Sequence, residues 1–404
     1  MSSTTPPPPA AAPPAGGTME RILRLMSEKQ ASDLYLSANA PALLRIHGEC
    51  VPVNSQLLPF DAPRNLLSEV LSAKRMEELD EVGELNVGLA LRNVGRFRIS
   101  AMRQRGSIAA VIRFIHGEIP PLGSLNLPPV LSELIMEKRG LILMVGATGS
   151  GKTTTLASMI DSRNAVATGH ILTLEDPVEF LFRNRRSVIN QREIGTDTSS
   201  LQVALRNALR QAPDVILIGE IRDRETMSAA IAYAQSGHLC LATLHANNSY
   251  QALNRVLSFY PPEVRASMLS DLAAALKAIV SQRLLRNLKG TRTPAVEVLL
   301  NTKLVSDMIA RGAFHDVQDA MEKSIAEGSQ TFEAELARLV LEGVVSRKEA
   351  MLNSDSSTNL TWRLENDFTQ AGRAAAQAAA ERLAPPESPD DEPSFTEIVL
   401  DVKH

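Results

Sequence analysis

The stretch Gly146–Thr153, "GATGSGKT", decides how the rest of the chain is interpreted. It has the pattern G-x-x-x-x-G-K-[ST]; the apolar segment "LILMV" (141–145) precedes it, and a helical pattern follows it. In such a loop the glycines let backbone N–H groups surround phosphate oxygens, and the dipole of the following helix favours negative charge. The alternative is a chance glycine-rich turn, which the flanking elements disfavour. We predict a phosphate-binding loop that consists of Gly146, Ala147, Thr148, Gly149, Ser150, Gly151, Lys152, Thr153 and Thr154.

Two side chains of this loop carry specific chemistry. Lys152 is expected to reach the β- and γ-phosphates of a bound nucleotide, and the Thr153 hydroxyl is expected to bind Mg²⁺. The sequence therefore predicts a nucleotide-binding protein that uses Mg²⁺.

Around this loop, apolar strand patterns alternate with helical patterns. Such alternation implies right-handed crossovers and a mostly parallel sheet covered by helices, so the fold class is α/β. The expected strands are 141–145, 170–174, 215–219 and 239–244, and the expected helices after the one that follows the loop are 201–211 and 224–235. Residues 250–366 are expected to be mainly helical. Within them, "SDLAAALKAIVSQRLL" (270–285) is expected to be a helix in the core or at a subunit interface rather than on a membrane surface.

The chain before the loop divides into three parts. Residues 1–17 contain Pro, Ala, Gly, Ser and Thr with a single Met, so they are expected to be a disordered tail. Residues 18–116 combine one helical pattern with short strand patterns, which indicates a small α/β domain. Residues 117–130 are rich in Pro and Gly and are expected to be a linker. Residues 131–249, which contain the loop, are expected to form the nucleotide-binding core. At the C-terminal end, 367–404 are expected to be an acidic, disordered tail.

Composition limits the compartment and the partners. The chain has 404 residues, 44% of them hydrophobic, and no apolar run approaches the ~18 residues of a membrane span. The N-terminal segment lacks the features of a secretory signal, and two distant cysteines form no disulfide framework, so a cytoplasmic protein is expected. The net charge is −4, and the acidic tail accounts for it, which leaves the body near neutral. We therefore expect no nucleic-acid partner.

Glu220 is the expected catalytic base. In "DVILIGEIRDRET" (214–226), Gly219 stands where many phosphate-loop enzymes have a metal-binding Asp, and Glu220 follows the strand by one residue. A carboxylate there could orient and deprotonate an attacking water. The alternative is a surface glutamate at the start of a helix.

The missing metal carboxylate is expected from "LTLEDPVEF" (172–180). Its acidic residues follow another strand of the parallel sheet, and ligands gather beyond the carboxyl ends of such strands. We assign Glu179 as a water-mediated Mg²⁺ contact, with Glu175 and Asp176 in support. A solvated acidic turn is the alternative.

Together these segments resemble a known superfamily. "GATGSGKTTT", "LEDPVEF", "LRQAPDVILIGEIRD" and "GHLCLATLHANN" occur in the order of the Walker A, Asp, Walker B and His boxes of the type II/IV secretion ATPases. The single N-terminal domain, the lack of a CxxC zinc motif, and the wording of "NQREIGTDT" and "ATLHANN" resemble the type IV pilus retraction branch, PilT/PilU type, and most of all PilU.

The resemblance implies a homo-hexameric ring of RecA-like domains, each preceded by a PAS-like domain. Such a ring hydrolyses ATP with Mg²⁺, drives an inner-membrane pilus platform protein from the cytoplasmic face, and powers pilus retraction and twitching motility. It is peripheral to the membrane and not inserted in it. The PilU-like character implies an accessory role beside a paralogous retraction ATPase.

The resemblance also implies roles for arginines of the N-terminal domain. Arg98 and Arg113, in "GRFRIS" and "VIRFI", match the arginines that contact phosphate in such rings. Arginine suits this task because its planar fork pairs with phosphate in a bidentate manner. The alternative is a pair of salt-bridged surface arginines on an edge strand.

Two histidines flank the strand 239–244. His245 falls at its carboxyl end, beside the strand that ends at Glu220, and we expect it to sense the γ-phosphate. His238 falls at the opposite end and is expected at a subunit interface. No nearby Cys or carboxylate completes a metal-ligand set for either histidine.

Two other functions remain possible on the sequence. One is a type II secretion or pilus-assembly ATPase, which the missing zinc motif disfavours. The other is a non-catalytic ATP-binding scaffold ring, which the presence of both Lys152 and Glu220 disfavours.

Overall fold

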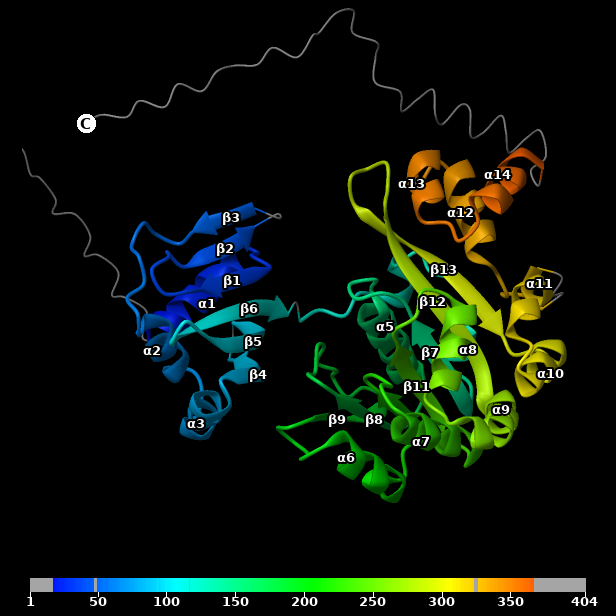
Figure 1. The fold of residues 1–404 in the computed structure, drawn as a ribbon, viewed down its shortest axis with the longest axis horizontal. Helices are drawn as coiled ribbons and strands as arrows, with labels where there is room; N and C mark the ends of the chain where they lie inside the picture. The colour runs from blue at the N-terminus through cyan, green and yellow to red at the C-terminus, as the bar shows by residue number, and fades with distance from the viewer. Residues whose placement is uncertain (1–16, 47–48, 93, 116, 323–325, 367–404) are drawn as a thin grey trace, which may run out of the picture.

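The computed structural model describes residues 17–46, 49–92, 94–115, 117–322 and 326–366. Apart from Gly17, the two expected disordered tails, 1–17 and 367–404, lie outside the described residues. The prediction of an α/β chain with a small first domain is confirmed, because the strands form two separate sheets. Figure 1 shows a smaller N-terminal part, blue to cyan, beside a larger part that carries the remaining elements.

The N-terminal domain is an antiparallel sheet with helices packed on it. The strand order is β3-β2-β1-β6-β5-β4. Strand β5 alternates strictly, with Phe97, Ile99 and Ala101 buried and the residues between them exposed. The elements are α1 (Thr18–Glu28), β1 (Asp33–Leu36), β2 (Leu43–Ile46), β3 (Glu49–Pro52), α2 (Ala62–Ser68), α3 (Ala73–Val82), β4 (Glu84–Leu91), β5 (Gly95–Gln104) and β6 (Ser107–Ile115).

The larger part has a seven-stranded sheet in the order β13-β12-β7-β11-β10-β8-β9. All neighbouring pairs are parallel except β12 with β13. The elements up to β11 are η1 (Leu122–Ser124), α4 (Val130–Leu134), β7 (Gly140–Val145), α5 (Lys152–Val166), β8 (Gly169–Glu175), β9 (Ser187–Glu193), α6 (Leu201–Ala208), η2 (Leu209–Gln211), β10 (Val215–Ile218), α7 (Arg224–Gln235) and β11 (Leu239–Leu244).

Helices cover both faces of this sheet. Residues Leu141 and Leu143 of β7 pack into one core with α6 to α10, whereas Ile142 and Met144 pack into another with α4 and α5. A strand that is buried on both faces needs apolar residues at every position, which explains the unbroken "LILMV".

The chain after β11 differs from the sequence-based expectation. The elements are α8 (Ser249–Ser258), α9 (Pro262–Ala275), β12 (Leu276–Arg286), β13 (Arg292–Leu300), α10 (Lys303–Arg311), η3 (Phe314–Asp316), α11 (Val317–Glu322), α12 (Phe332–Leu341), α13 (Arg347–Leu352) and α14 (Ser357–Asn366). Figure 1 shows α12, α13 and α14 as a group in orange, near the long β12–β13 hairpin. We call these three helices the C-terminal lobe.

The predicted helix 270–285 is wrong beyond Ala275. From Leu276 the chain is strand β12, which pairs in parallel with β7 and antiparallel with β13. The run from Ala278 to Val280 is buried on both sides, and a continuous apolar run does not distinguish a buried strand from a helix by its period. In 250–322 and 326–366, the regular elements are therefore helices except for two strands that belong to the central sheet.

One carboxylate connects the two parts of the chain. Glu193, at the end of β9, is 6% exposed and accepts a hydrogen bond from Arg96 of β5, with 3.1 Å between Arg96 Nη2 and Glu193 Oε2. The same oxygen accepts the backbone N–H of Val178 at 3.1 Å. Arg75 adds a second link, since its Nη2 donates to the carbonyl of Gly195 at 2.7 Å.

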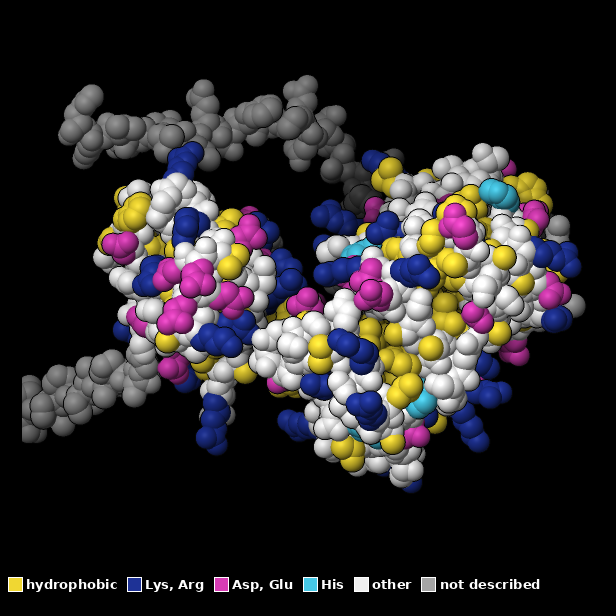
Figure 2. Space-filling model, turned by 60° about the horizontal axis from the view of Figure 1, so that its bottom comes forward, with side chains coloured by type: hydrophobic (Ala, Val, Ile, Leu, Met, Phe, Trp, Pro, Cys, Tyr) yellow, Lys and Arg dark blue, Asp and Glu magenta, His cyan; other side chains and the backbone are white. Residues whose placement is uncertain are grey.

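Figure 2 shows basic and acidic side chains interspersed over the visible face, without one continuous basic stripe. No helix among the described residues is both long enough and apolar enough to cross a membrane.

Candidate active site

The loop that precedes α5 requires glycine at its two ends. Gly146 has φ +153° and Gly151 has φ +89°, values that favour glycine. A Cβ on Gly146 would lie 2.5 Å from the backbone carbonyl oxygen of Gln282, and a Cβ on Gly151 would lie 2.7 Å from the side-chain amide nitrogen of the same residue. Between them, residues 147–149 are exposed. The loop therefore exposes its backbone to solvent at the N-terminus of a helix, where anions bind favourably.

Lys152 is folded onto its own loop. Its side chain is buried, and Nζ donates to the carbonyl oxygens of Gly146 at 2.7 Å and Ala147 at 2.9 Å. Burial lowers the pKa of Lys152, and the nearby carboxylates of Glu220 and Glu179 act in the opposite direction. The lysine charge thus lies close to both predicted acidic residues, at the point where phosphate would enter.

Gln282 braces the loop from strand β12 and was not predicted. It is 3% exposed; its Nε2 donates to the Ser150 carbonyl and its Oε1 accepts from the Thr155 hydroxyl, both at 2.8 Å. The prediction of a helix over 270–285 could not indicate this role, because Gln282 lies beside the loop only when the segment is a strand. Next to the brace a hollow of ≈650 Å³ opens, lined by Ala147, Thr148, Gly149, Ser150, Asn247, Gln282, Arg283, Leu284, Arg286, Arg292, Glu349 and Asn353.

The acidic segment after β8 divides into a buried and a solvent-facing part. Glu175 ends the strand and is 6% exposed; its Oε1 accepts from the Thr173 hydroxyl at 2.6 Å and from Gln191 at 3.3 Å. Burial raises the pKa of Glu175, and these hydrogen bonds oppose the rise. Asp176 is exposed and Glu179 is half-buried. Of the three, Glu179 is the one whose charge acts on Lys152.

Glu220 lies past β10 at the same edge of the sheet. Its Oε2 accepts from Arg222 Nε at 2.8 Å, and its Oε1 lies 3.2 Å from His245 Nε2. The side chain is 22% exposed, which leaves room for a water molecule or a phosphate. The contact between Arg222 and Glu220 was not predicted, although Arg222 lies inside the quoted "GEIRD" and is a candidate for an ion pair at a subunit interface.

The two histidines are separated as expected. His245 follows β11 and is half-exposed beside Glu220, and the hydroxyl of Thr243 on the same strand donates to the carbonyl of Gly219. His238 precedes β11, at the opposite end, where its Nδ1 contacts the Ser236 hydroxyl at 3.1 Å. The placement of β11 beside β10 agrees with the sequence argument.

Arg98 and Arg113 lie opposite one another on adjacent strands. They are paired residues of β5 and β6, and both side chains are exposed. Neither strand is at an edge of the sheet, so that part of the alternative is wrong. Arg113 does form an ion pair, with 3.0 Å between its Nε and Asp33 Oδ1, while like charges placed directly across a sheet disfavour each other.

The residues present suit Mg²⁺ only together with a nucleotide. Among the described residues, no three His, Cys, Asp or Glu side chains gather closely enough to hold a metal ion. Mg²⁺ is commonly held by one or two protein oxygens plus substrate phosphates and waters. Thr153, in the first turn of α5, and Glu179 offer the oxygen ligands that such a site needs.

Known proteins resemble this chain over most of its length. A family model described as "Type II/IV secretion system protein" matches residues 19–380. The "Type IV pilus ATPase PilU" of Pseudomonas aeruginosa is 44% identical over 84% of this chain and 90% of its own length. The "Type IV pilus retractation ATPase PilT" of the same organism is 34% identical over 81% of this chain and 96% of its own. A crystal structure of the pilus retraction motor PilT with bound ADP has a TM-score of 0.77 and 38% identity, covering 83% of this chain and 97% of that one.

Proposed function

Because the chain belongs to the type II/IV secretion system protein family, we propose that it is an ATPase that powers type IV pilus retraction and twitching motility. The observation that carries the proposal is the convergence of Lys152, Glu220 and His245 at one edge of the sheet. The chain that contains them resembles a named type IV pilus ATPase and a named pilus retraction ATPase over four fifths of its length.

Each residue at this edge has a distinct role. The backbone of residues 146–154 surrounds the phosphates, and Lys152 exchanges its two carbonyl contacts for the β- and γ-phosphates. Glu220 accepts a proton from the attacking water, and His245, which touches Glu220, responds to loss of the γ-phosphate. Thr153 and Glu179 would hold Mg²⁺, which neutralises phosphate charge when bound. Glu175 and Asp176 support the acidic segment.

The working unit is a homo-hexamer. In it, Arg98 and Arg113 contact the phosphates of a bound nucleotide from the N-terminal domain, and His238 lies at a subunit interface. Arg113 pairs with Asp33, and its like charge faces Arg98 on the exposed side of the sheet. A phosphate would relieve the repulsion between the two arginines, which supports this assignment.

The ring acts at the cytoplasmic face of the inner membrane, peripheral to it and not inserted. Its partner there is the pilus platform protein, and it works as an accessory motor beside a paralogous retraction ATPase. The accessory role follows from the PilU-like wording of the sequence motifs, in a chain that is 44% identical to PilU. The near-neutral body and the interspersed surface charge give no support to a nucleic-acid partner.

Steady-state ATP hydrolysis by the purified protein tests the enzymatic part. Wild type is expected to turn over, Lys152→Ala to lose nucleotide binding, and Glu220→Gln to bind ATP without turnover. Wild type that binds ATP but never hydrolyses it would instead favour a scaffold ring.

Pilus number and twitching in a deletion strain test the biological part. Loss of retraction leaves pilated cells that do not twitch. Bald cells would contradict the proposal and favour a role in pilus assembly.

A further inference from the structure

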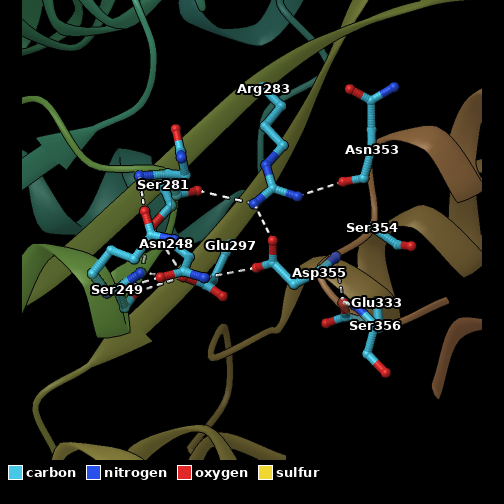
Figure 3. A network of polar contacts seen from close by, with 12 residues as sticks. Asn248, Ser249, Ser281, Arg283, Glu297, Glu333, Asn353, Ser354, Asp355 and Ser356 are labelled. Atoms are coloured by element: carbon cyan, nitrogen blue, oxygen red, sulfur yellow. Dashed lines mark hydrogen bonds and ion pairs between the residues drawn. The ribbon is translucent and has the colours of Figure 1, made fainter. Parts of the chain in front are cut away.

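Asp355, in the turn between α13 and α14, reaches the segment that follows His245. Its Oδ1 accepts from Arg283 of β12, and its Oδ2 accepts from Asn248 Nδ2 at 2.9 Å (Figure 3). Arg283 in turn donates to the carbonyl of Asn247 at 3.1 Å. Asn247 and Asn248 follow His245 by two and three residues, so one carboxylate of the C-terminal lobe fixes both residues at the end of this loop.

The ion pair at the centre of this contact is shielded from water. The side chains of Arg283 and Asp355 are 17% and 25% exposed. The Arg283 guanidinium carbon lies 3.9 Å from the ring centroid of Phe332, a fully buried residue of α12. Exposed ion pairs contribute little because water competes for both charges, and a pair stacked on an aromatic ring escapes much of that competition.

The lobe presents Asp355 in a fixed orientation. Glu333 of α12 is buried, and its Oε1 accepts the backbone N–H groups of Asp355 at 3.0 Å and Ser356 at 2.9 Å. The turn before α14 is therefore held to α12 by a carboxylate, as Figure 3 shows. A shift of the lobe would carry Asp355 with it.

The next residue along the chain is held independently. Glu297 of β13 accepts the Ser249 backbone N–H at 2.7 Å and the Ser249 and Ser281 hydroxyls at 2.6 and 3.0 Å. These contacts fix the first turn of α8 from within the sheet. The contacts that the lobe makes with this loop are therefore confined to Asn247 and Asn248. Helix α8 also holds both residues, because the Asn247 backbone N–H donates to Gln251 Oε1 at 3.2 Å and Asn248 Oδ1 accepts the Gln251 backbone N–H at 2.8 Å.

We propose that Asp355 is a positioning residue for ATP hydrolysis, acting through Arg283 and Asn248 on the segment that carries His245. The proposal rests on the proposed ATPase function. Asp355 touches no nucleotide group; it sets the geometry of a residue that does. The lobe and the phosphate edge are thereby linked through one carboxylate, and small displacements of a catalytic segment are enough to slow a reaction.

The test is steady-state ATP turnover by the full-length protein carrying Asp355→Ala or Asp355→Asn. Asp355→Ala is expected to lower kcat about tenfold and to change KM by less than about twofold. Asp355→Asn keeps one acceptor oxygen but not two, so its kcat is expected to lie between those of wild type and Asp355→Ala. The matched control is Glu342→Gln, which removes a carboxylate partner of Arg338 on the same lobe and should leave turnover unchanged.

Two further measurements separate positioning from a structural role. In the double variant Arg283→Gln/Asp355→Ala, the loss of kcat should be smaller than the two single losses combined, because Arg283 and Asp355 share one ion pair. Circular dichroism establishes folding at the assay temperature, and Asp355→Asn carries the test if Asp355→Ala does not fold.

Wild-type kcat in folded Asp355→Ala, or additive losses in the double variant, would overturn the proposal. Lys152→Ala in the same assay distinguishes failure of the proposed ATPase function from failure of the positioning role of Asp355. If it hydrolyses ATP at the wild-type rate, the proposed function fails and not merely the role of Asp355.

Discussion

His245 and Glu220 face each other from the ends of neighbouring parallel strands, with 3.2 Å between His245 Nε2 and Glu220 Oε1. They are 25 positions apart in sequence, and the pairing of β10 with β11 brings them together. Arg222 holds the other oxygen of the same carboxylate. The predicted base thus already has two partners that can fix its orientation before any substrate binds.

Replacing Glu220 with Gln should remove the base while preserving its shape. We expect turnover to fall about a hundredfold or more, because that is the usual contribution of a positioned general base. Binding of a fluorescent ADP analogue should remain within about threefold of wild type. Glu225→Gln, in the first turn of α7, is the matched control and should keep full turnover. Equal turnover of the two variants would contradict the assignment of Glu220.

Arg98→Gln should separate a phosphate contact from a surface role. The substitution removes one of two like charges that face each other across β5 and β6, so the melting temperature should stay the same or rise slightly. ATP turnover of the assembled protein should nevertheless fall about tenfold or more. Arg92→Gln, an exposed arginine of the same domain, serves as the control. Unchanged turnover in Arg98→Gln would remove this arginine from the site.

Gln282→Ala should loosen the phosphate-binding loop. It leaves the Ser150 carbonyl and the Thr155 hydroxyl without the partners that they have now. Buried polar groups that lose a partner cost about 1–3 kcal/mol of unfolding free energy. We also expect ADP affinity to fall about tenfold, measured by isothermal titration calorimetry. The control is Gln235→Ala, at an exposed glutamine of α7; equal ADP affinity in both variants would argue against a bracing role.

Glu297 should make the protein less stable as pH rises. Burial raises its pKa above the ordinary 4.5, and the hydrogen bonds from Ser249 and Ser281 oppose the rise, while nearby Asp355 adds to it. A raised pKa means that the folded state binds the proton of Glu297 more tightly than the unfolded state does. The resulting contribution to the free energy of unfolding is complete below the unfolded pKa and is lost as pH rises through the folded pKa.

Urea unfolding of Glu297→Gln from about pH 5 to about pH 8 measures this effect. The variant should lose less unfolding free energy over that range than wild type. It should not lose all of the dependence, because the pKa of Glu175 is also raised by burial. Glu342→Gln, a half-exposed carboxyl, should retain the wild-type slope, and an unchanged slope in Glu297→Gln would contradict the prediction.

The parts of the site that lie in short motifs were predictable from the sequence. The loop 146–153 and the edge position of Glu220 follow from strand ends and glycine spacing, which are local features. The alternation of strands and helices predicted that β7, β8, β10 and β11 are parallel and that their carboxyl ends lie at one edge of the sheet. It did not predict the register between these strands.

The parts that depend on distant contacts were not predictable. Gln282 and Arg283 act from a strand whose apolar run also fits a helix, and Asp355 acts from a turn with no motif around it. Strand β9 was missed because polar Ser187 and Glu193 occupy buried positions while Val188 is exposed, so its sequence lacks the apolar–polar alternation of a strand. Such roles come from long-range pairing, which single-sequence patterns do not encode.

The carboxylate of Glu193 leaves the protein little freedom to adjust its two parts separately. Arg96 and the Val178 backbone share one oxygen, and Val178 directly precedes Glu179. If the N-terminal domain moved away, the buried carboxylate of Glu193 would lose its cationic partner. Removing one partner of a buried ion pair is strongly destabilising. A separation of the N-terminal domain from Glu193 would therefore act, through Val178, on Glu179, one of the two carboxylates whose charge acts on the lysine of the phosphate loop.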